Sequence, residues 1–243
     1  MDDKAVKIAA DTEETRKTAT DNVLEAMLSL IQDGGLEPGD KLPSEGQMAL
    51  DFGASRGTVR ETVRALSQLG VLDVGNGRRA TVAAFTGEKL AVLIDHAVRT
   101  SQVTVVQTWD FRQTLEIRVA RLAALRREDS DIANMRLMTE RMKNALGNTD
   151  ELTEADINLH LAWARAAKNP LFVVNMESLK SVMRRTGPIG WAALGGSDMV
   201  LEHIQIHEQL TEAIAERRSE DAVQLMSRHF EVARAALYDS GLA

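Results

Sequence analysis

The sequence predicts a mainly α-helical protein in two parts: an N-terminal winged helix-turn-helix with a small β-hairpin wing, followed by an all-α antiparallel helical bundle. Residues 43–66 hold two short helical patterns separated by the turn Phe52-Gly53-Ala54-Ser55. Two β-prone runs lie at 71–82, on either side of an Asn-Gly pair. After Phe85 the strand patterns stop and helical periodicity takes over.

Length and composition set the broad class. The 243 residues suit two modest domains, and we expect a polar segment over 1–20, a winged domain over 21–85 and a helical domain over 86–243. No apolar run approaches the roughly 18 residues that span a bilayer. The N-terminus also lacks the apolar core of a signal peptide, so we expect a cytoplasmic protein with no membrane partner. Without cysteine, the chain has no disulfide framework, no cysteine-ligated zinc and no thiol nucleophile.

The first two helices are marked by their ends. Residues 22–33 place apolar side chains on one face and end at Gly34-Gly35. Ser44 is placed to cap the short helix that follows, and Gln47 is spaced to reach back to it as in a capping box.

The next helix begins after Ser55, its expected N-cap. Its apolar positions recur at helical spacing, while the opposite face carries one arginine per turn: Arg56, Arg60 and Arg64. A short helix, a glycine-containing turn and an arginine-faced helix are typical of a helix-turn-helix that binds DNA. Arginine forks match guanine edges or phosphates, and the first turn of such a helix reaches the base edges. Arg64, two turns further on, is either a phosphate contact or a solvent-exposed side chain.

A β-hairpin is expected directly after the arginine-faced helix. Residues 71–74 and 80–82 flank Gly75-Asn76-Gly77, a pattern typical of a tight turn. This position favours a wing, with Arg78 and Arg79 at its tip or at the start of the returning strand. The alternative is an incidental surface hairpin.

Three stretches together resemble the winged-helix domain of GntR-family bacterial transcription regulators over about residues 21–83. They are Pro38-Gly39-Asp40-Lys41-Leu42-Pro43-Ser44-Glu45, Phe52-Gly53-Ala54-Ser55-Arg56-Gly57-Thr58-Val59-Arg60-Glu61 and Leu69-Gly70-Val71-Leu72. The resemblance implies that Arg56, Thr58 and Arg60 contact DNA and that the Gly77 wing tip enters the minor groove. Ser55, Arg64 and Arg78 complete the DNA-binding set that we expect. The family commonly has a basic residue after Pro-Ser-Glu, where this chain has Gly46.

The charge distribution is unusual for a DNA-binding protein. The formal net charge is −7, and residues 21–85 hold nine acidic against six basic residues. Five of those basic residues are arginines within 55–79, so the positive charge is concentrated in the segment that we expect to contact DNA. The acidic excess weakens non-specific binding, which makes a homodimer on paired half-sites more necessary.

From residue 88 onward the pattern predicts six or seven helices. The first, 88–99, is expected to turn Leu90, Leu93, Ile94 and Ala97 inward, and the second, 104–127, has Trp109, Leu115, Val119, Leu122 and Leu125 among its apolar positions. Further helices are expected at 129–146, 151–168, 170–185, 197–217 and 219–238. Asn148-Thr149-Asp150, Asn169-Pro170, Gly187-Pro188 and Gly195-Gly196 are the expected separators. This pattern predicts a helical bundle.

All but one of the five histidines lie after residue 159, in a spacing that brings several together. Asp156 and His160 are four apart on one helix and share a face. His207 lies eleven residues before Arg218, where the last two helices turn, and His229 lies eleven after it. Positions equidistant from the turn of an antiparallel hairpin lie side by side. One carboxylate and three imidazoles suit Zn²⁺, Ni²⁺ or Mn²⁺. A lone histidine is more often a polar core or surface residue.

The helical part resembles the FCD ligand-binding domain of the FadR subgroup of GntR regulators over about residues 88–238. The resemblance rests on 156–160 and 167–171, then on 207–214 with 220–222 and 226–229. It implies Asp156, His160, His207 and His229 as metal ligands in a bundle cavity. His203 is outside the matched pattern and is left as a supporting or surface residue. The family's acid-x-Arg is matched by Asp110-Phe111-Arg112, so Arg112 either pairs with an effector carboxylate or forms an ordinary helix salt bridge.

The expected function is that of a metabolite-responsive transcription repressor. A homodimer would bind an inverted-repeat operator in double-stranded DNA and release it when a small carboxylate enters the metal-containing pocket. One alternative is a metal-dependent hydrolase fused to a DNA-binding domain. No separate general base or nucleophile stands out, which makes an enzyme the weaker interpretation. The other alternative is an architectural DNA binder without effector control.

Overall fold

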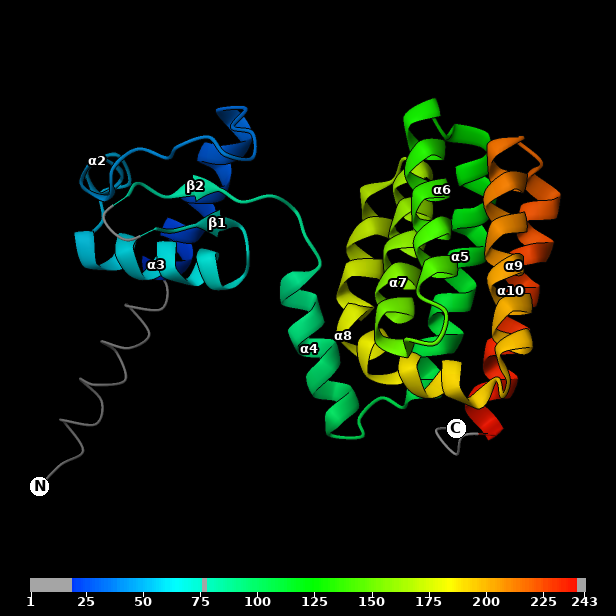
Figure 1. The fold of residues 1–243 in the computed structure, drawn as a ribbon. Coiled ribbons are helices and arrows are strands. Elements are labelled where there is room, and N and C mark those ends of the chain that lie inside the picture. The colour runs from blue at the N-terminus through cyan, green and yellow to red at the C-terminus, as the bar shows by residue number, and fades with distance from the viewer. Residues whose placement is uncertain (1–18, 76–77, 240–243) are drawn as a thin grey trace, which may run out of the picture. The chain divides into compact units, whose positions relative to one another are not determined.

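The computed structural model of the protein describes residues 19–75 and 78–239 (Figure 1). Two compact units divide between Phe85 and Thr86. The expected polar segment lies mostly outside the described residues, as does the wing-tip residue Gly77. No helix in the described ranges is long and apolar enough to cross a membrane.

The first unit is a winged helix-turn-helix. A helix over 19–33 is followed by α2 (Glu45–Asp51), α3 (Arg56–Gln68), β1 (Leu72–Asp73) and β2 (Thr81–Val82). The two strands are antiparallel, with Leu72 opposite Val82 and Asp73 opposite Thr81. One small core unites the helices and the first strand, and its fully buried members include Met27, Leu42, Met48, Val59, Leu66 and Leu72.

Serine caps place the two helices of the motif. Ser44 accepts a hydrogen bond from the backbone N–H of Gln47, and Ser55 accepts one from Thr58. The expected capping box at Gln47 does not form, because its side-chain amide donates to Asp51 at 2.7 Å instead. Between the helices Gly53 has φ +62°, a left-handed conformation that glycine adopts without steric cost.

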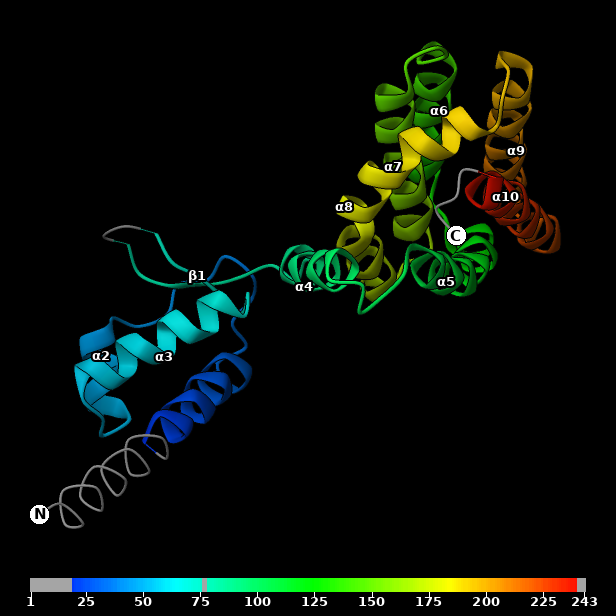
Figure 2. The same cartoon turned by 90° about the horizontal axis from the view of Figure 1, so that it is seen from below.

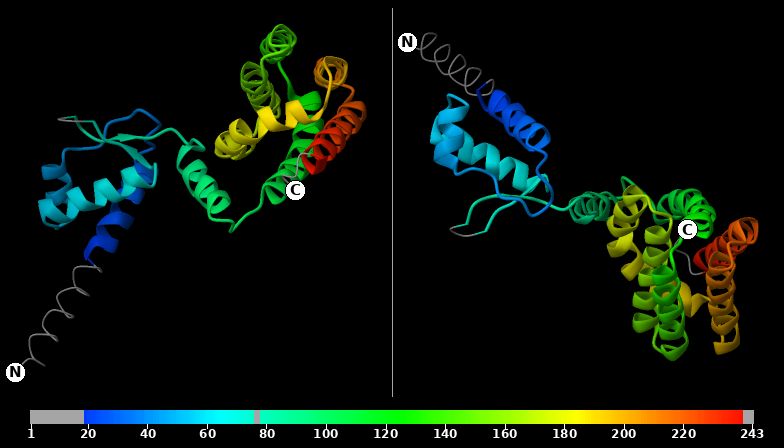
Figure 3. Two further views of the ribbon diagram at one scale, coloured as in Figure 1. Left: turned by 60° about the horizontal axis from the view of Figure 1, so that its bottom comes forward. Right: turned by 90° about the horizontal axis from the view of Figure 1, so that it is seen from above.

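The second unit is an all-α bundle of seven helices in the described residues (Figures 1 and 3). They are α4 (Glu88–Arg99), α5 (Val105–Arg126), α6 (Asp129–Asn144), α7 (Thr149–Ala166), α8 (Pro170–Ala193), α9 (Ser197–Ala215) and α10 (Ser219–Asp239). Helix α7 packs on α5, α6 and α8, while α10 packs on α5 and α9. One continuous apolar core runs through this unit and includes Trp163 and Phe230.

Helix α4 differs from expectation in the face that it buries. Leu93 is 66% exposed and Leu90 is exposed too, whereas Ile94 and Ala97 are half-buried. The rotation of α4 is set by Asp95, which accepts hydrogen bonds from Ser181 (3.0 Å) and Arg185 (2.7 Å) on α8.

Polar contacts hold α4 at two points along α8. Arg99 and then Arg185 hold the pKa of Asp95 down at about 2, so its carboxylate stays charged at neutral pH. At the start of α4, the N–H of Gly87 donates to Glu177 on α8 at 3.0 Å. Helix α4 is therefore attached to α8 at both its first turn and its middle.

Helix α8 continues through Gly187-Pro188, where the sequence suggested a break. Proline lacks the N–H that would bond one turn back, and it crowds the Cβ of the residue before it. Gly187 has no Cβ, so that part of the clash is absent. The last turns of α8 run across toward α9 (Figure 2) and bury Trp191.

Three arginines bind backbone carbonyls at the C-terminal ends of other helices. Arg126 donates to Ala167 O (3.1 Å) after α7, and Arg127 donates to Ala215 O at the end of α9. Arg217 donates to Leu125 O at 2.9 Å, near the end of α5. These carbonyls lack partners within their own helices. Leu125 itself is 55% exposed, so its expected place on the apolar face is wrong.

Candidate functional site

The expected DNA-contacting residues lie at the start of α3. Arg56 and Arg60 are exposed there. The Ser55 Oγ accepts the Thr58 N–H at 3.0 Å and lies 2.9 Å from the Thr58 hydroxyl, so both cap side chains are held in place. Arg64, one turn after Arg60, donates to Glu61 at 2.9 Å. Its guanidinium therefore already has a partner on the same helix, whereas Arg56 and Arg60 form no ion pair with a described residue.

Gly46 makes room for Arg56. A Cβ added at Gly46 would lie 3.5 Å from the Arg56 Nη2, so the guanidinium sits directly over the glycine. The two positions are thus neighbours on the same surface. A side chain at position 46 would share space with Arg56.

The wing carries two further cations. Arg78 and Arg79 are exposed before β2, and they line a surface hollow together with Lys41. Asp73, on β1, lines the same hollow and offsets part of this positive charge. The cationic groups of the wing are therefore available to a phosphate backbone.

Three histidines from three helices converge in the bundle. His160 on α7, His207 on α9 and His229 on α10 are buried, and one ring nitrogen from each lies within 4.8 Å of the others. The ring centroids of His207 and His229 are 4.6 Å apart, as the symmetry of the α9–α10 hairpin predicts. The chain reverses at Arg217, whose φ is +60°.

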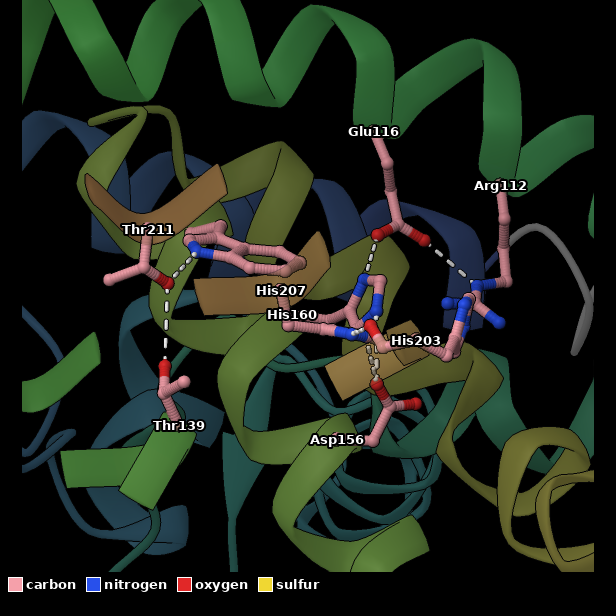
Figure 4. Close-up of polar contacts among 9 residues, drawn as sticks. Arg112, Glu116, Thr139, Asp156, His160, His203, His207 and Thr211 are labelled. Carbon is pink, nitrogen blue, oxygen red and sulfur yellow. Dashed lines mark hydrogen bonds and ion pairs between the residues drawn. The ribbon is translucent and has the colours of Figure 1, made fainter. Parts of the chain in front are cut away.

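Asp156 joins the same cluster (Figure 4). Its Oδ1 is 2.9 Å from the Nε2 of His207 and 3.4 Å from the Nε2 of His160. Both imidazoles thus point the same ring atom at one carboxylate oxygen. The structure brings together all four residues that the sequence singled out.

A fourth histidine, His203, is part of the cluster although the sequence left it as a supporting or surface residue. It is 3% exposed, and its ring stacks on His229 with centroids 4.9 Å apart. The edge of Trp191 covers it from α8, at 5.3 Å. The His203 carbonyl accepts the Nδ1–H of His207 at 2.8 Å, and its own Nδ1 has no hydrogen-bond partner in the described residues.

Arg112 points into the bundle from α5, and its acidic partner there is Glu116. Asp110 is exposed, whereas Glu116, one turn after Arg112, is buried. The Arg112 Nε donates to Glu116 Oε1 at 2.8 Å, and the other carboxylate oxygen accepts from the His160 Nδ1 (Figure 4). The rings of Trp109 and Phe230 flank the guanidinium at 4.9 and 5.4 Å.

The buried charges balance one another. Burial opposes the charged form of His160, but Glu116 and Asp156 outweigh it and raise the pKa of His160 to about 9. Burial likewise raises the pKa of Glu116, and Arg112 and His160 more than offset it, so the net shift is downward.

Burial keeps the imidazoles of His203 and His229 neutral. Burial, followed by the neighbouring His207, lowers the pKa of His203 to about 3. The same two causes hold the pKa of His229 well below its ordinary value. A neutral imidazole is the form that binds a metal ion.

The described structure leaves several polar atoms around the cluster unpaired. Both ring nitrogens of His229, the Nε2 of His160 and the Nη2 of Arg112 are buried without a hydrogen bond to any described residue. An unpaired buried polar atom costs about 1–3 kcal/mol, and such a concentration is typical of a site that a water, an ion or a ligand completes.

A cavity of about 40 Å³ adjoins these atoms. Arg112, Asp156, His203 and His229 form its polar side. The apolar side comes largely from the end of α8, and the residues there are Met183, Thr186, Gly187, Gly190, Trp191 and Leu194. The volume suits only a few water-sized groups.

Two family descriptions match the chain. The one for bacterial regulatory proteins of the gntR family matches residues 19–82, and that for the FCD domain matches residues 107–232. The first covers the winged unit, and the second covers α5 to α10 with every residue of the cluster.

Curated relatives and a solved structure extend this similarity over most of the chain. The transcriptional regulator LutR of Bacillus subtilis strain 168 is 29% identical over 204 residues, which cover 82% of this chain and 92% of LutR. The Glc operon transcriptional activator of Escherichia coli K12 is 30% identical over 173 residues, 69% of this chain and 68% of the activator. Streptococcus agalactiae GntR has the same fold, with a TM-score of 0.71, 20% identity, and coverage of 89% of this chain and 99% of that one.

Proposed function

Because this chain belongs to the gntR family of bacterial regulatory proteins and carries an FCD domain, we propose that it is a repressor that a small carboxylate releases from an inverted-repeat operator. The relatives are transcription regulators, so the hydrolase alternative is set aside. Their names include both the Glc operon activator and a galactonate operon repressor of E. coli K12. Because the relatives include an activator and a repressor, we give repression as part of the proposal. We also propose that the protein acts in the cytoplasm, where a bacterial operator lies.

The DNA-binding surface of the proposal is the start of α3 together with the wing. Arg56 and Arg60 read bases or bind phosphates, and Ser55 and Thr58 support them at the helix start. Arg78 and the Gly77 tip contact the adjacent minor groove. Arg64 contributes a phosphate contact only when it leaves Glu61. A homodimer places two such surfaces on two half-sites, as a twofold operator requires.

The metal part of the proposal rests on the donor set. Three buried imidazoles and one carboxylate suit Zn²⁺, Ni²⁺ or Mn²⁺, and the unpaired nitrogens of His229 fit a role as ligand. We assign His160, His207, His229 and Asp156 as the residues that hold the ion. When bound, the ion supplies a coordination position for an oxygen of the effector.

Arg112 is the proposed second contact for the effector. Its guanidinium lines the cavity, its Nε is used by Glu116, and its buried Nη2 is unpaired in the described residues. A carboxylate is the group that fits a buried guanidinium best. The cavity volume of about 40 Å³ favours an effector of few atoms, unless the end of α8 moves outward.

Control of DNA binding requires that the effector bind the two states of the regulator with different affinity. The single observation that carries this function is a buried metal-type donor set beside a cavity that Arg112 lines together with two of the four assigned ligands, Asp156 and His229. An architectural DNA binder would have no use for such a site.

The experiment is a pair of variants measured for metal and for DNA. Elemental analysis and operator anisotropy are run on wild type, Arg60→Ala and His207→Ala. We expect Arg60→Ala to lose operator affinity and keep its metal, whereas His207→Ala loses metal and still binds operator without responding to carboxylates. A panel of small carboxylates from formate to citrate is then titrated into the wild-type complex. An acid that binds tightly by calorimetry but leaves operator affinity unchanged contradicts the switching function.

A further inference from the structure

Glu116 is the one buried carboxylate of the cluster that does not face the cavity. It is 1% exposed and does not line the cavity, whereas the other carboxylate of the cluster, Asp156, does line it. Each of its oxygens has one partner: Oε1 accepts from Arg112, and Oε2 accepts from His160 (Figure 4). We propose that Glu116 is a positioning residue, which fixes the His160 ring so that Nε2 is the nitrogen that binds the ion.

The argument follows from what each atom can donate. Arg112 is always protonated and has donors only, so it holds Glu116 as an acceptor. A carboxylate that accepts from the His160 Nδ1 requires a hydrogen on that nitrogen. The Nε2, which faces Asp156 at 3.4 Å, is then the ring atom that gives up its proton when an ion binds.

The neighbouring ligand is oriented in the same way by a different group. The Nδ1–H of His207 donates to the backbone carbonyl of His203 at 2.8 Å, and its Nε2 lies 2.9 Å from Asp156. Glu116 therefore does for His160 what the carbonyl does for His207. Such outer partners of metal-bound histidines fix the tautomer and raise the affinity of the ligand. Unlike the carbonyl, Glu116 can be replaced.

The position of Glu116 also links the ion to the effector, a consequence that rests on the proposed function. Arg112 and Glu116 are one helical turn apart on α5, so they share a face and a rigid backbone. Arg112 uses its Nε on Glu116, its Nη2 has no partner in the described residues, and its side chain lines the cavity. Arg112 thus lies two hydrogen bonds from the proposed metal ligand His160, and a carboxylate bound to Arg112 lies three.

The test compares zinc binding by full-length wild type, Glu116→Gln and a matched control. Glutamine has the same shape as glutamate, but its side-chain amide has one acceptor oxygen and one NH2 group that only donates. It therefore cannot accept hydrogen bonds at both positions, from Arg112 and from the His160 Nδ1–H. The control, Glu220→Gln, removes an exposed carboxylate that pairs with Arg121 on α5. Zn²⁺ affinity is measured by competition with a chelator after removal of metal. We expect Glu116→Gln to bind Zn²⁺ about 10–100-fold more weakly and the control to match wild type.

A second measurement does not depend on the variant folding. Long-range ¹H–¹⁵N spectra of wild type loaded with Zn²⁺ report which ring nitrogen of each histidine carries a proton. We expect His160 to keep its hydrogen on Nδ1 and to bind through Nε2. Binding through Nδ1 overturns the role of Glu116, and so does a Glu116→Gln protein that binds Zn²⁺ within threefold of wild type. If His207→Ala also binds Zn²⁺ like wild type, the proposed metal site is contradicted. This result distinguishes a wrong metal site from a wrong role for Glu116 alone.

Discussion

His203 shows at the scale of one residue how a site can cost stability. Its imidazole is buried between His229 and Trp191, and its Nδ1 has no partner in the described residues. A nitrogen in this state costs about 1–3 kcal/mol unless a ligand pairs with it. We therefore interpret it as a group kept for binding rather than for folding.

Replacing His203 with phenylalanine is expected to stabilise the metal-free protein. The ring keeps its stacking on His229, the unpaired nitrogen disappears, and the adjoining cavity accepts the added volume. We expect a gain of about 1 kcal/mol, measured as a higher melting temperature in EDTA. His96→Phe, at an exposed position on α4, is the control and leaves the melting temperature unchanged. A lower melting temperature for His203→Phe means that its Nδ1 is paired in solution.

The residues of the site were predictable from sequence to different degrees. Sequence spacing was enough to predict that four residues come together, because the helical period and the symmetry of a helical hairpin can be read from the chain. These residues are Asp156, His160, His207 and His229. Glu116 was missed. Its only sequence sign is an acid one turn after Arg112, on the face that also carries the buried Val119, and a buried acid looks the same as a solvated one until its partners are known.

At the scale of one element, α8 shows where local sequence rules give way to packing. Gly187-Pro188 has the composition of a helix end, yet the helix continues because Gly187 lies against Thr153 of α7. A Cβ on Gly187 would lie 2.5 Å from the Thr153 Cγ2. Tertiary contact, which periodicity cannot report, decided this boundary. The same is true of the rotation of α4, which depends on Asp95 and its partners on α8.

The two glycines at the end of α8 give a matched pair of variants. Gly187→Ala is expected to destabilise the protein by about 1–3 kcal/mol through overpacking against Thr153. Gly190→Ala meets no atom within 4 Å and is expected to stabilise by about 0.5–1 kcal/mol, since alanine is the better helix former. Urea denaturation of the full chain measures both. Equal stability of the two variants would mean that α8 ends before Gly187 in solution.

For the whole molecule, charge decides how DNA is found. A net charge of −7 opposes approach to a polyanion, so in the proposed function the affinity for DNA comes from a few arginines and from two half-sites bound by one homodimer. Position 46 lies beside Arg56 and holds a glycine in place of a basic residue. DNA affinity therefore depends even more on the few arginines that remain. Selectivity for the operator over bulk DNA is the expected benefit.

Gly46→Arg tests that balance. The new guanidinium lies beside Arg56 and adds one phosphate contact per protomer. Non-specific duplex DNA should then bind more tightly, and the slope of log affinity against log salt should steepen by about 2 for a dimer. Anisotropy over a salt series measures this slope. Gly46→Gln adds similar bulk without charge and should leave the slope unchanged. An unchanged slope for Gly46→Arg shows that position 46 does not face DNA.

We expect the three carbonyl-binding arginines to lengthen the lifetime of the folded bundle. Their hydrogen bonds join residues 41, 88 and 92 apart in the chain: Arg126 to Ala167, Arg127 to Ala215 and Arg217 to Leu125. Contacts between such distant segments form after the helices have already come together. Interactions that are absent from the folding transition state slow unfolding and leave the folding rate nearly unchanged. We therefore expect these arginines to slow unfolding without changing the folding rate. Stopped-flow experiments measure both rates.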